Sequence, residues 1–127
     1  MMAYTPKDFL VWGEIPVTDM DGATKFYQQV TGADLELVTD GPNPMLVFHP
    51  LDRANGIALS IYPGTPAPDG VGPTLHLAAE GTLEVTMERV TAAGGQVVSE
   101  PVPLPAGRFF YAKDPDGNSV GFYEAAS

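Results

Sequence analysis

The first clearly patterned segment of the chain, residues 9–17, is strand-like because it is rich in apolar and β-branched residues, with Glu14 as its one charged position. Successive side chains of an extended strand point to opposite faces, so a strand here would have two different faces. One face would carry Val11, Gly13, Ile15 and Val17, and the other would carry Trp12, Glu14 and Pro16. The spacing then becomes helical, because apolar residues recur at Ala23, Phe26, Tyr27 and Val30.

Residue types typical of helix ends bracket this helical stretch. Asp19 is a suitable N-cap, Asp21 lies near the positive end of the helix dipole, and Gly32 is a typical stop signal. Strands separated by turn-forming residues are predicted next, at residues 35–39, 45–49 and 56–62. The first half of the chain is therefore a βαβββ unit.

The second half repeats this order after a linker rich in proline and glycine, residues 63–73. Thr82 is a suitable N-cap for a second helix, which ends at Gly94 and Gly95. The predicted strands lie at residues 74–79, 96–100, 108–113 and 119–124. We predict an α+β fold in which two βαβββ modules, at about residues 8–62 and 74–124, form one domain over residues 1–127.

Composition and charge narrow the function classes. The 127 residues are 44% hydrophobic, which is typical of a globular domain. The net charge of −10, with only six Lys and Arg residues, argues against binding nucleic acid or an anionic membrane surface. No run reaches the roughly 18–20 apolar residues of a membrane helix, and the first residues have no apolar signal core. The absence of cysteine excludes disulfides and thiolate catalysis, and we expect a cytoplasmic protein.

Two motifs together resemble one known family. The first is the strand, Asp19, the helix with Phe26 and Tyr27, and Gly32; the second is the sequence Asp-Pro-Asp-Gly-Asn at residues 114–118. That second motif predicts a tight hairpin turn, because proline presets φ and glycine accepts a positive φ. The pair resembles the vicinal-oxygen-chelate superfamily of glyoxalase I, bleomycin-resistance proteins and extradiol dioxygenases, over about residues 9–124. The resemblance implies sheets that curl around a cavity, with four His or Glu metal ligands in the metal-dependent members.

The resemblance also implies where those four ligands would stand in this chain. The positions fall at Trp12, near Leu59 and Ser60, at His76 and at Gly121. Only His76 has a side chain that usually binds a divalent metal. Glu14 lies on the same strand face as Trp12 and could substitute for one ligand, which still leaves only two. We therefore expect neither a bound metal nor another cofactor.

The strand residues suggest how a cavity would bind an organic molecule instead. Glu14, desolvated beside Trp12, and His76 are candidate general acid and base residues. The alternatives are that Glu14 pairs with Arg108 or Lys113 or is exposed, and that His76 is a structural strand residue. The candidate ligand-binding residues are Trp12, Glu14, Phe48, Ser60, His76, Tyr111, Gly121 and Tyr123. Gly121 would leave room for an organic ligand where the family places a carboxylate.

The expected function is therefore the binding of a small, aromatic or apolar organic molecule in a cavity that lacks the full metal site. One alternative is a lyase, isomerase or dioxygenase that uses a degenerate metal site or acid–base chemistry by Glu14 and His76. The other alternative is a regulatory or interaction module without a ligand. We expect a homodimer, because the family often completes its cavity across an interface and because short strands leave sheet edges open.

Overall fold

The computed structural model describes residues 3–126, which form two modules of similar element order. The first module contains β1 (Trp12–Val17), α1 (Met20–Thr31), β2 (Leu35–Val38), β3 (Met45–Phe48) and β4 (Ala58–Pro63). The second contains β5 (Leu75–Ala78), α2 (Leu83–Ala92), β6 (Gln96–Val97), β7 (Val102–Leu104), β8 (Gly107–Lys113) and β9 (Ser119–Ala125). The predicted α+β fold of two βαβββ-like modules is confirmed.

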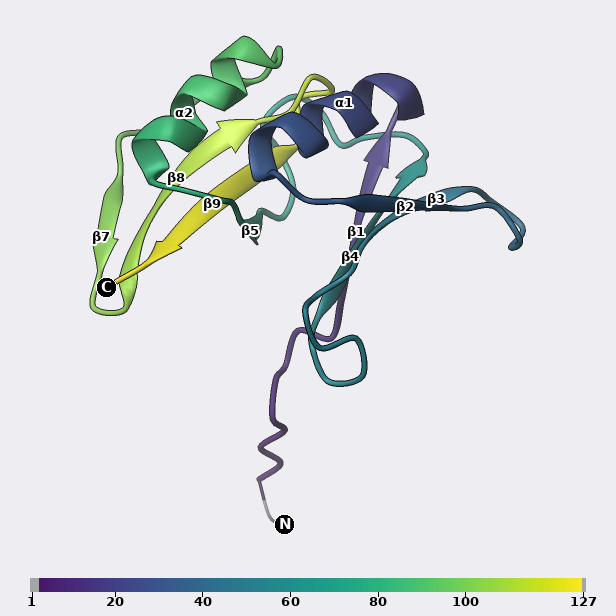
Figure 1. The fold of residues 1–127 in the computed structure, drawn as a ribbon, viewed down its shortest axis with the longest axis horizontal. Coiled ribbons are helices and arrows are strands. Elements are labelled where there is room, and N and C mark those ends of the chain that lie inside the picture. The colour runs from purple at the N-terminus through teal and green to yellow at the C-terminus, as the bar shows by residue number, and fades with distance from the viewer. Residues whose placement is uncertain (1–2, 127) are drawn as a thin grey trace.

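Each module builds one mixed sheet. The first sheet has the order β1-β4-β3-β2, and the second has the order β5-β9-β8-β6, with β7 paired to β8. In both sheets the opening strand pairs in parallel with the last strand of its module, while the remaining pairs are antiparallel. Figure 1 shows α1 and α2 side by side on one side of the two sheets, which splay apart beneath them. The sheets therefore have a helix-covered face and an open face.

The helix boundaries follow the expected signals. Gly32 ends α1 in the left-handed conformation, with φ of 76°, and its amide donates to the Gln28 carbonyl. Asp19 precedes α1, but its carboxylate makes no capping hydrogen bond. Thr82 does cap α2, because its hydroxyl accepts from the amide of Val85. Neither helix in the part of the chain that the structure describes is long and apolar enough to cross a bilayer.

The turn at residues 114–118 joins the two modules. Asp114 is 4% exposed and accepts hydrogen bonds from the Tyr27 hydroxyl at 2.8 Å and from the amides of Asp116 and Asn118 at 2.9 Å. The Asn118 side chain donates to the Pro16 carbonyl in the first module at 2.8 Å. Burial, with the charge of Asp114, raises the pKa of Tyr27 well above its ordinary value, so the hydroxyl remains a donor. The predicted turn is thus also an inter-module contact.

Two of the expected strands are three residues shorter than predicted, whereas the other limits differ by one or two residues. Strand β1 begins at Trp12 instead of residue 9, because the paired strand β4 begins opposite it at Ala58. Residues before Trp12 form an extended arm in Figure 1, where Phe9 is 80% and Val11 72% exposed. Strand β6 covers only residues 96–97 of the expected 96–100, and β7 is an additional short strand.

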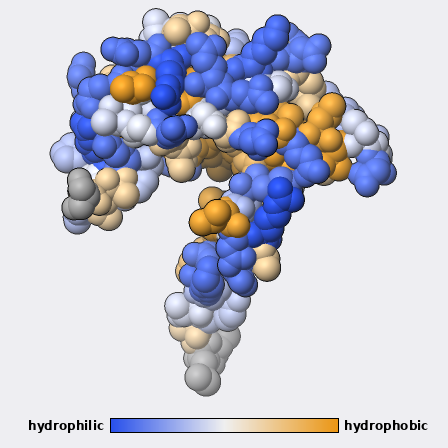
Figure 2. All heavy atoms as spheres, viewed as in Figure 1, coloured by the Kyte–Doolittle hydropathy of each residue, from blue (hydrophilic) through white to orange (hydrophobic). Residues whose placement is uncertain are grey.

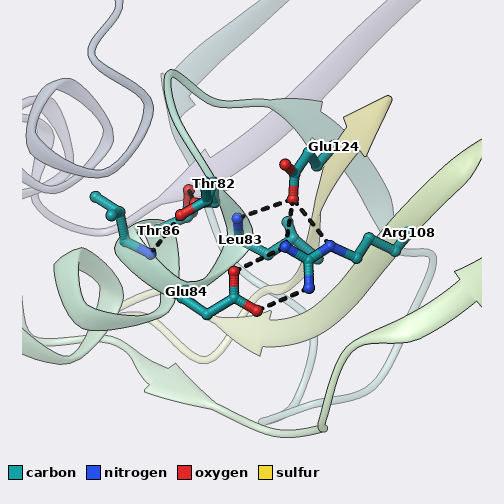
Figure 3. Close-up of polar contacts among 7 residues, drawn as sticks. Thr82, Leu83, Glu84, Thr86, Arg108 and Glu124 are labelled. Carbon is teal, nitrogen blue, oxygen red and sulfur yellow. Dashed lines mark hydrogen bonds and ion pairs between the residues drawn. The ribbon is translucent and has the colours of Figure 1, made fainter. Parts of the chain in front are cut away.

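An arginine ties the second helix to its sheet. The Arg108 guanidinium donates two hydrogen bonds of 2.7 Å to Glu84 on α2 and one of 2.9 Å to Glu124 on β9 (Figure 3). Glu124 also accepts from the amide of Leu83, in the first turn of α2. A carboxylate at this end of a helix is favourable because the dipole is positive there. Arg108 on β8 therefore links α2 to the second sheet through Glu84 and Glu124.

Candidate functional site

Strand alternation decides which side chains reach the open face. On β8, Phe110 and Ala112 are buried against the helices, so Phe109 and Tyr111 lie on the opposite side of the sheet. On β9, Phe122 is buried, and Tyr123 is half-buried on the other side. On β1 the buried residues are Gly13, Ile15 and Val17. Trp12, Glu14, Tyr111 and Tyr123 thus lie away from the helix-covered core.

His76 is the centre of an aromatic cluster on the second sheet. It lies opposite Gly121 in the register of β5 and β9, and its ring meets Phe109 edge-on at 4.9 Å between centroids. The Tyr111 ring lies 5.7 Å from His76 and 5.1 Å from Phe109. These separations are typical of favourable aromatic contacts. The two aromatic rings thus restrict the position of the imidazole.

The space above Gly121 is not open to a ligand. A Cβ atom added to Gly121 would collide with Nδ1 and Cε1 of His76. The expectation that an organic ligand would occupy this room is wrong, because the imidazole fills it. Glycine at position 121 is instead what allows His76 to approach the strand.

The environment of His76 favours the neutral imidazole. Desolvation by burial lowers its pKa below the ordinary value of 6.5. No side chain or backbone group among residues 3–126 hydrogen-bonds to the ring. A neutral imidazole with free nitrogens can donate to or accept from a bound molecule.

The first sheet brings together two other predicted residues. Glu14 and Ser60 are direct neighbours on the parallel strands β1 and β4. Glu14 is exposed and Trp12 is 43% exposed, so the expected desolvated carboxylate beside the indole is absent from the single chain. Ser60 is fully buried, and its hydroxyl has no hydrogen-bond partner among the described residues.

The alternative that Glu14 pairs with Arg108 or Lys113 is wrong, because both cations have other partners among residues 3–126. Arg108 is bound by Glu84 and Glu124, and the Lys113 ammonium lies 2.9 Å from the carboxylate of Asp69. His49 is half-buried, and its Nε2 atom lies 2.6 Å from a carboxylate oxygen of Glu36.

A cavity of about 510 Å³ lies at the junction of the two modules. Most of its wall is apolar and comes from the arm, β1, β3, β4 and β5: Leu10, Gly13, Phe48, Pro50, Ile57, Ala58, Leu59, Leu75, Leu77, Ala78 and Ala79. Thr31, Ala33, His49, His76 and Glu80 complete the lining. Its size and composition are typical of sites for small organic ligands. In Figure 2 apolar residues gather beside α1 over the first module, whereas the surface over α2 is mostly hydrophilic.

Sequence reasoning found only part of this lining. Phe48 and His76 were predicted and contribute to the cavity, whereas Trp12, Glu14, Tyr111 and Tyr123 are outside its lining. Thr31, Ala33, Pro50 and Glu80 were missed because each lies at or just beyond the end of an element. Such positions have no periodic pattern, so only the packing of the two modules shows that they converge.

The side chains present do not fit a metal centre. No group of three or more His, Asp or Glu residues within residues 3–126 is arranged to hold a metal ion. At the four positions implied by the resemblance, an exposed indole, a buried hydroxyl and a glycine accompany His76. Indole and glycine offer no metal donor, and Zn²⁺ sites usually need three or four protein ligands.

Comparisons with known proteins agree with this architecture. Residues 9–122 match the family described as the glyoxalase/bleomycin resistance protein/dioxygenase superfamily. The chain is 30% identical over 119 residues to "Putative glyoxylase CFP32" from Mycobacterium tuberculosis and from Mycobacterium bovis. That match includes 90% of this chain but only 44% of those relatives, so the chain spans less than half their length.

Solved structures show the same fold at low sequence identity. The fosfomycin resistance protein FosX from Listeria monocytogenes superposes with a TM-score of 0.69 and is 16% identical, over 96% of this chain and 94% of that one. A glyoxalase/bleomycin resistance protein from Albidiferax ferrireducens gives a TM-score of 0.67 at 22% identity, over 94% of this chain and all of the other.

Proposed function

Because this chain belongs to the glyoxalase/bleomycin resistance protein/dioxygenase superfamily, we propose that it binds a small organic molecule with an aromatic or apolar body, without a metal. The supporting observation is the cavity of about 510 Å³, whose wall is apolar except at a few polar side chains. A ligand would bury its apolar body between the modules, and each Å² removed from water would contribute about 25 cal/mol.

His76 would orient that ligand. The aromatic contacts with Phe109 and Tyr111 fix its ring, and its lowered pKa keeps the imidazole neutral near pH 7. A neutral imidazole can exchange a hydrogen bond with a hydroxyl or carbonyl group without the cost of burying a charge. This arrangement supports binding directly and needs no second acid–base residue.

Titration calorimetry with 1-naphthylmethanol, a neutral aromatic alcohol, tests the proposal. We expect one saturable site per chain, with backbone amide shifts in ¹⁵N NMR spectra confined to the residues that line the cavity. His76→Phe keeps an aromatic ring but removes both nitrogens, so it should weaken binding about fivefold to tenfold, equivalent to about one hydrogen bond. Tyr111→Phe, outside the cavity lining, is the matched control and should change nothing.

Saturable binding with amide shifts confined to Phe109, Tyr111 and Tyr123, which are outside the cavity lining, would contradict the placement of the site. No saturable binding of this probe or of its amine and carboxylate analogues would contradict the function itself.

A further inference from the structure

We propose that the cavity selects a ligand with a positive charge, whose ammonium or comparable cationic group lies beside Glu80. This inference rests on the proposed function and adds the ligand's charge to it. The cationic group would enter at one polar end of the cavity while the apolar body occupies the rest.

Glu80 stands where the C-terminal end of α1 meets the end of β5. Its backbone amide donates to the carbonyl of Thr31 at 3.0 Å. Its side chain lies against Gly32, where an added Cβ would come within 2.8 Å of the carboxylate oxygen Oε2. Glycine at position 32, with φ of 76°, therefore both ends the helix and leaves room for the carboxylate.

The helix end adds to the negative potential of Glu80. The C-terminus of an α-helix carries a partial negative charge from its unpaired carbonyl groups. The last turn of α1 contains no basic side chain that would compensate this charge. A cation at the polar end of the cavity would therefore interact favourably with both the carboxylate and the helix dipole.

Glu80 is the one carboxylate in the lining that the described residues form, and the other polar groups there are paired or neutral. Thr31 uses its hydroxyl within α1, because it donates to the Tyr27 carbonyl and accepts from the Ala33 amide. His49 is paired with Glu36, and His76 has a lowered pKa. The Glu80 carboxylate forms no hydrogen bond or ion pair with any residue of the range 3–126.

No lysine or arginine among the described residues lines the cavity. The Arg89 guanidinium donates to the backbone carbonyl of Glu80 at 2.7 Å, but among the described residues it forms no ion pair with the Glu80 carboxylate. The net charge of −10 adds a long-range field that attracts cations and repels anions. An anionic ligand would find no lysine or arginine in the lining that the described residues form.

Three probes that share one aromatic body test how much the ligand's charge contributes to affinity, apart from burial of the apolar body. These are 1-naphthylmethylamine, 1-naphthylmethanol and 1-naphthoate, which are a cation, a neutral molecule and an anion at pH 7. We expect the cation to bind about tenfold more tightly than the anion by calorimetry, with the alcohol between them, given one exposed carboxylate and one helix end. In 0.5 M NaCl the difference should shrink, because salt screens exposed charges.

Glu80→Gln should reduce the affinity for the amine by at least threefold and leave the affinity for the alcohol unchanged. Glu88→Gln removes the same charge from an exposed position on α2 outside the cavity, so it is the matched control and should have no such effect.

Equal binding of the three probes, or an unchanged preference in Glu80→Gln, would overturn the charge inference while the proposed function stands. An equal loss in Glu88→Gln would overturn the assignment to Glu80, because it would show that only net charge matters. Binding of none of the probes would overturn the proposed function together with this inference.

Discussion

At the scale of single residues, the contact between Gly121 and His76 illustrates how a missing side chain shapes the site. The two residues are register partners on β5 and β9, and the imidazole occupies the volume that any Cβ at position 121 would need. The resemblance to metal-dependent relatives implies only the loss of a metal ligand at this position. In the structure, the lack of a side chain at Gly121 leaves the space that the His76 ring occupies.

We predict that Gly121→Ala destabilises the protein by roughly 1–3 kcal/mol, as expected when extra volume is forced into a packed site. The added methyl must displace His76, which also disturbs the contacts with Phe109 and Tyr111. Urea unfolding measures the change. In a His76→Ala background the same substitution should cost much less, and equal costs in both backgrounds would contradict the role assigned to the imidazole.

At the scale of elements, the terminal hairpin does more than close the second sheet. Its turn supplies Asp114 and Asn118, which bind Tyr27 on α1 and the carbonyl of Pro16 on β1. Asp116 also accepts hydrogen bonds from the amide and the hydroxyl of Thr18. The residue types of this motif are those that a tight turn requires, and the same residues also hold the two modules together. The cavity lies at the junction of these modules.

Tyr27→Phe removes the hydroxyl that donates to the buried carboxylate of Asp114. Hydrogen bonds to charged groups typically contribute about 1.5–3 kcal/mol, and we expect a loss of that order in urea unfolding at pH 7. Tyr111→Phe is the control, because Tyr111 is 38% exposed and its hydroxyl has no hydrogen-bond partner among the described residues. Equal stability of the two variants would contradict the role of the turn as a link between modules.

The limits of the elements were predictable where local signals decide them. Gly32 and Thr82 act as the sequence suggested, and the hairpin turn lies where Pro115 and Gly117 require it. The start of β1 was not predictable in this way, because residues 9–11 are as apolar and as strand-like as residues 12–17. A strand begins only where a partner strand is present to accept and donate its backbone hydrogen bonds. Trp12 pairs with Ala58, the first residue of β4, so β1 begins there.

At the scale of the whole molecule, one chain leaves apolar surface uncovered. Phe9, Val11 and Trp12 are 80%, 72% and 43% exposed, and they run along the arm into β1. Strands β1 and β5 are edge strands of their sheets within the described residues. Unpaired edges and apolar patches of this kind are typical of surfaces that meet another chain.

We therefore predict a homodimer, with a mass twice that of one chain by light scattering at micromolar concentration. Val11→Asp places a charge on the arm and should shift the protein towards the monomer. Val85→Asp, on the exposed side of α2 at 38% exposure, is the control and should leave the dimer intact. A monomeric mass for the unchanged protein would contradict the prediction.

The two-module α+β fold was predictable from the sequence alone, because strand and helix periodicities, capping residues and turn residues act over a few neighbouring positions. The resemblance implies where the four metal positions of the family fall, and the residue types at three of them are not usual ligands. The location of the cavity, in contrast, depends on tertiary packing. Thr31, Glu80 and Phe48 belong to different elements, and their convergence depends on how α1, β3 and β5 pack together. Packing over long sequence distances likewise decided that Glu14 is exposed and that His76 fills the space above Gly121.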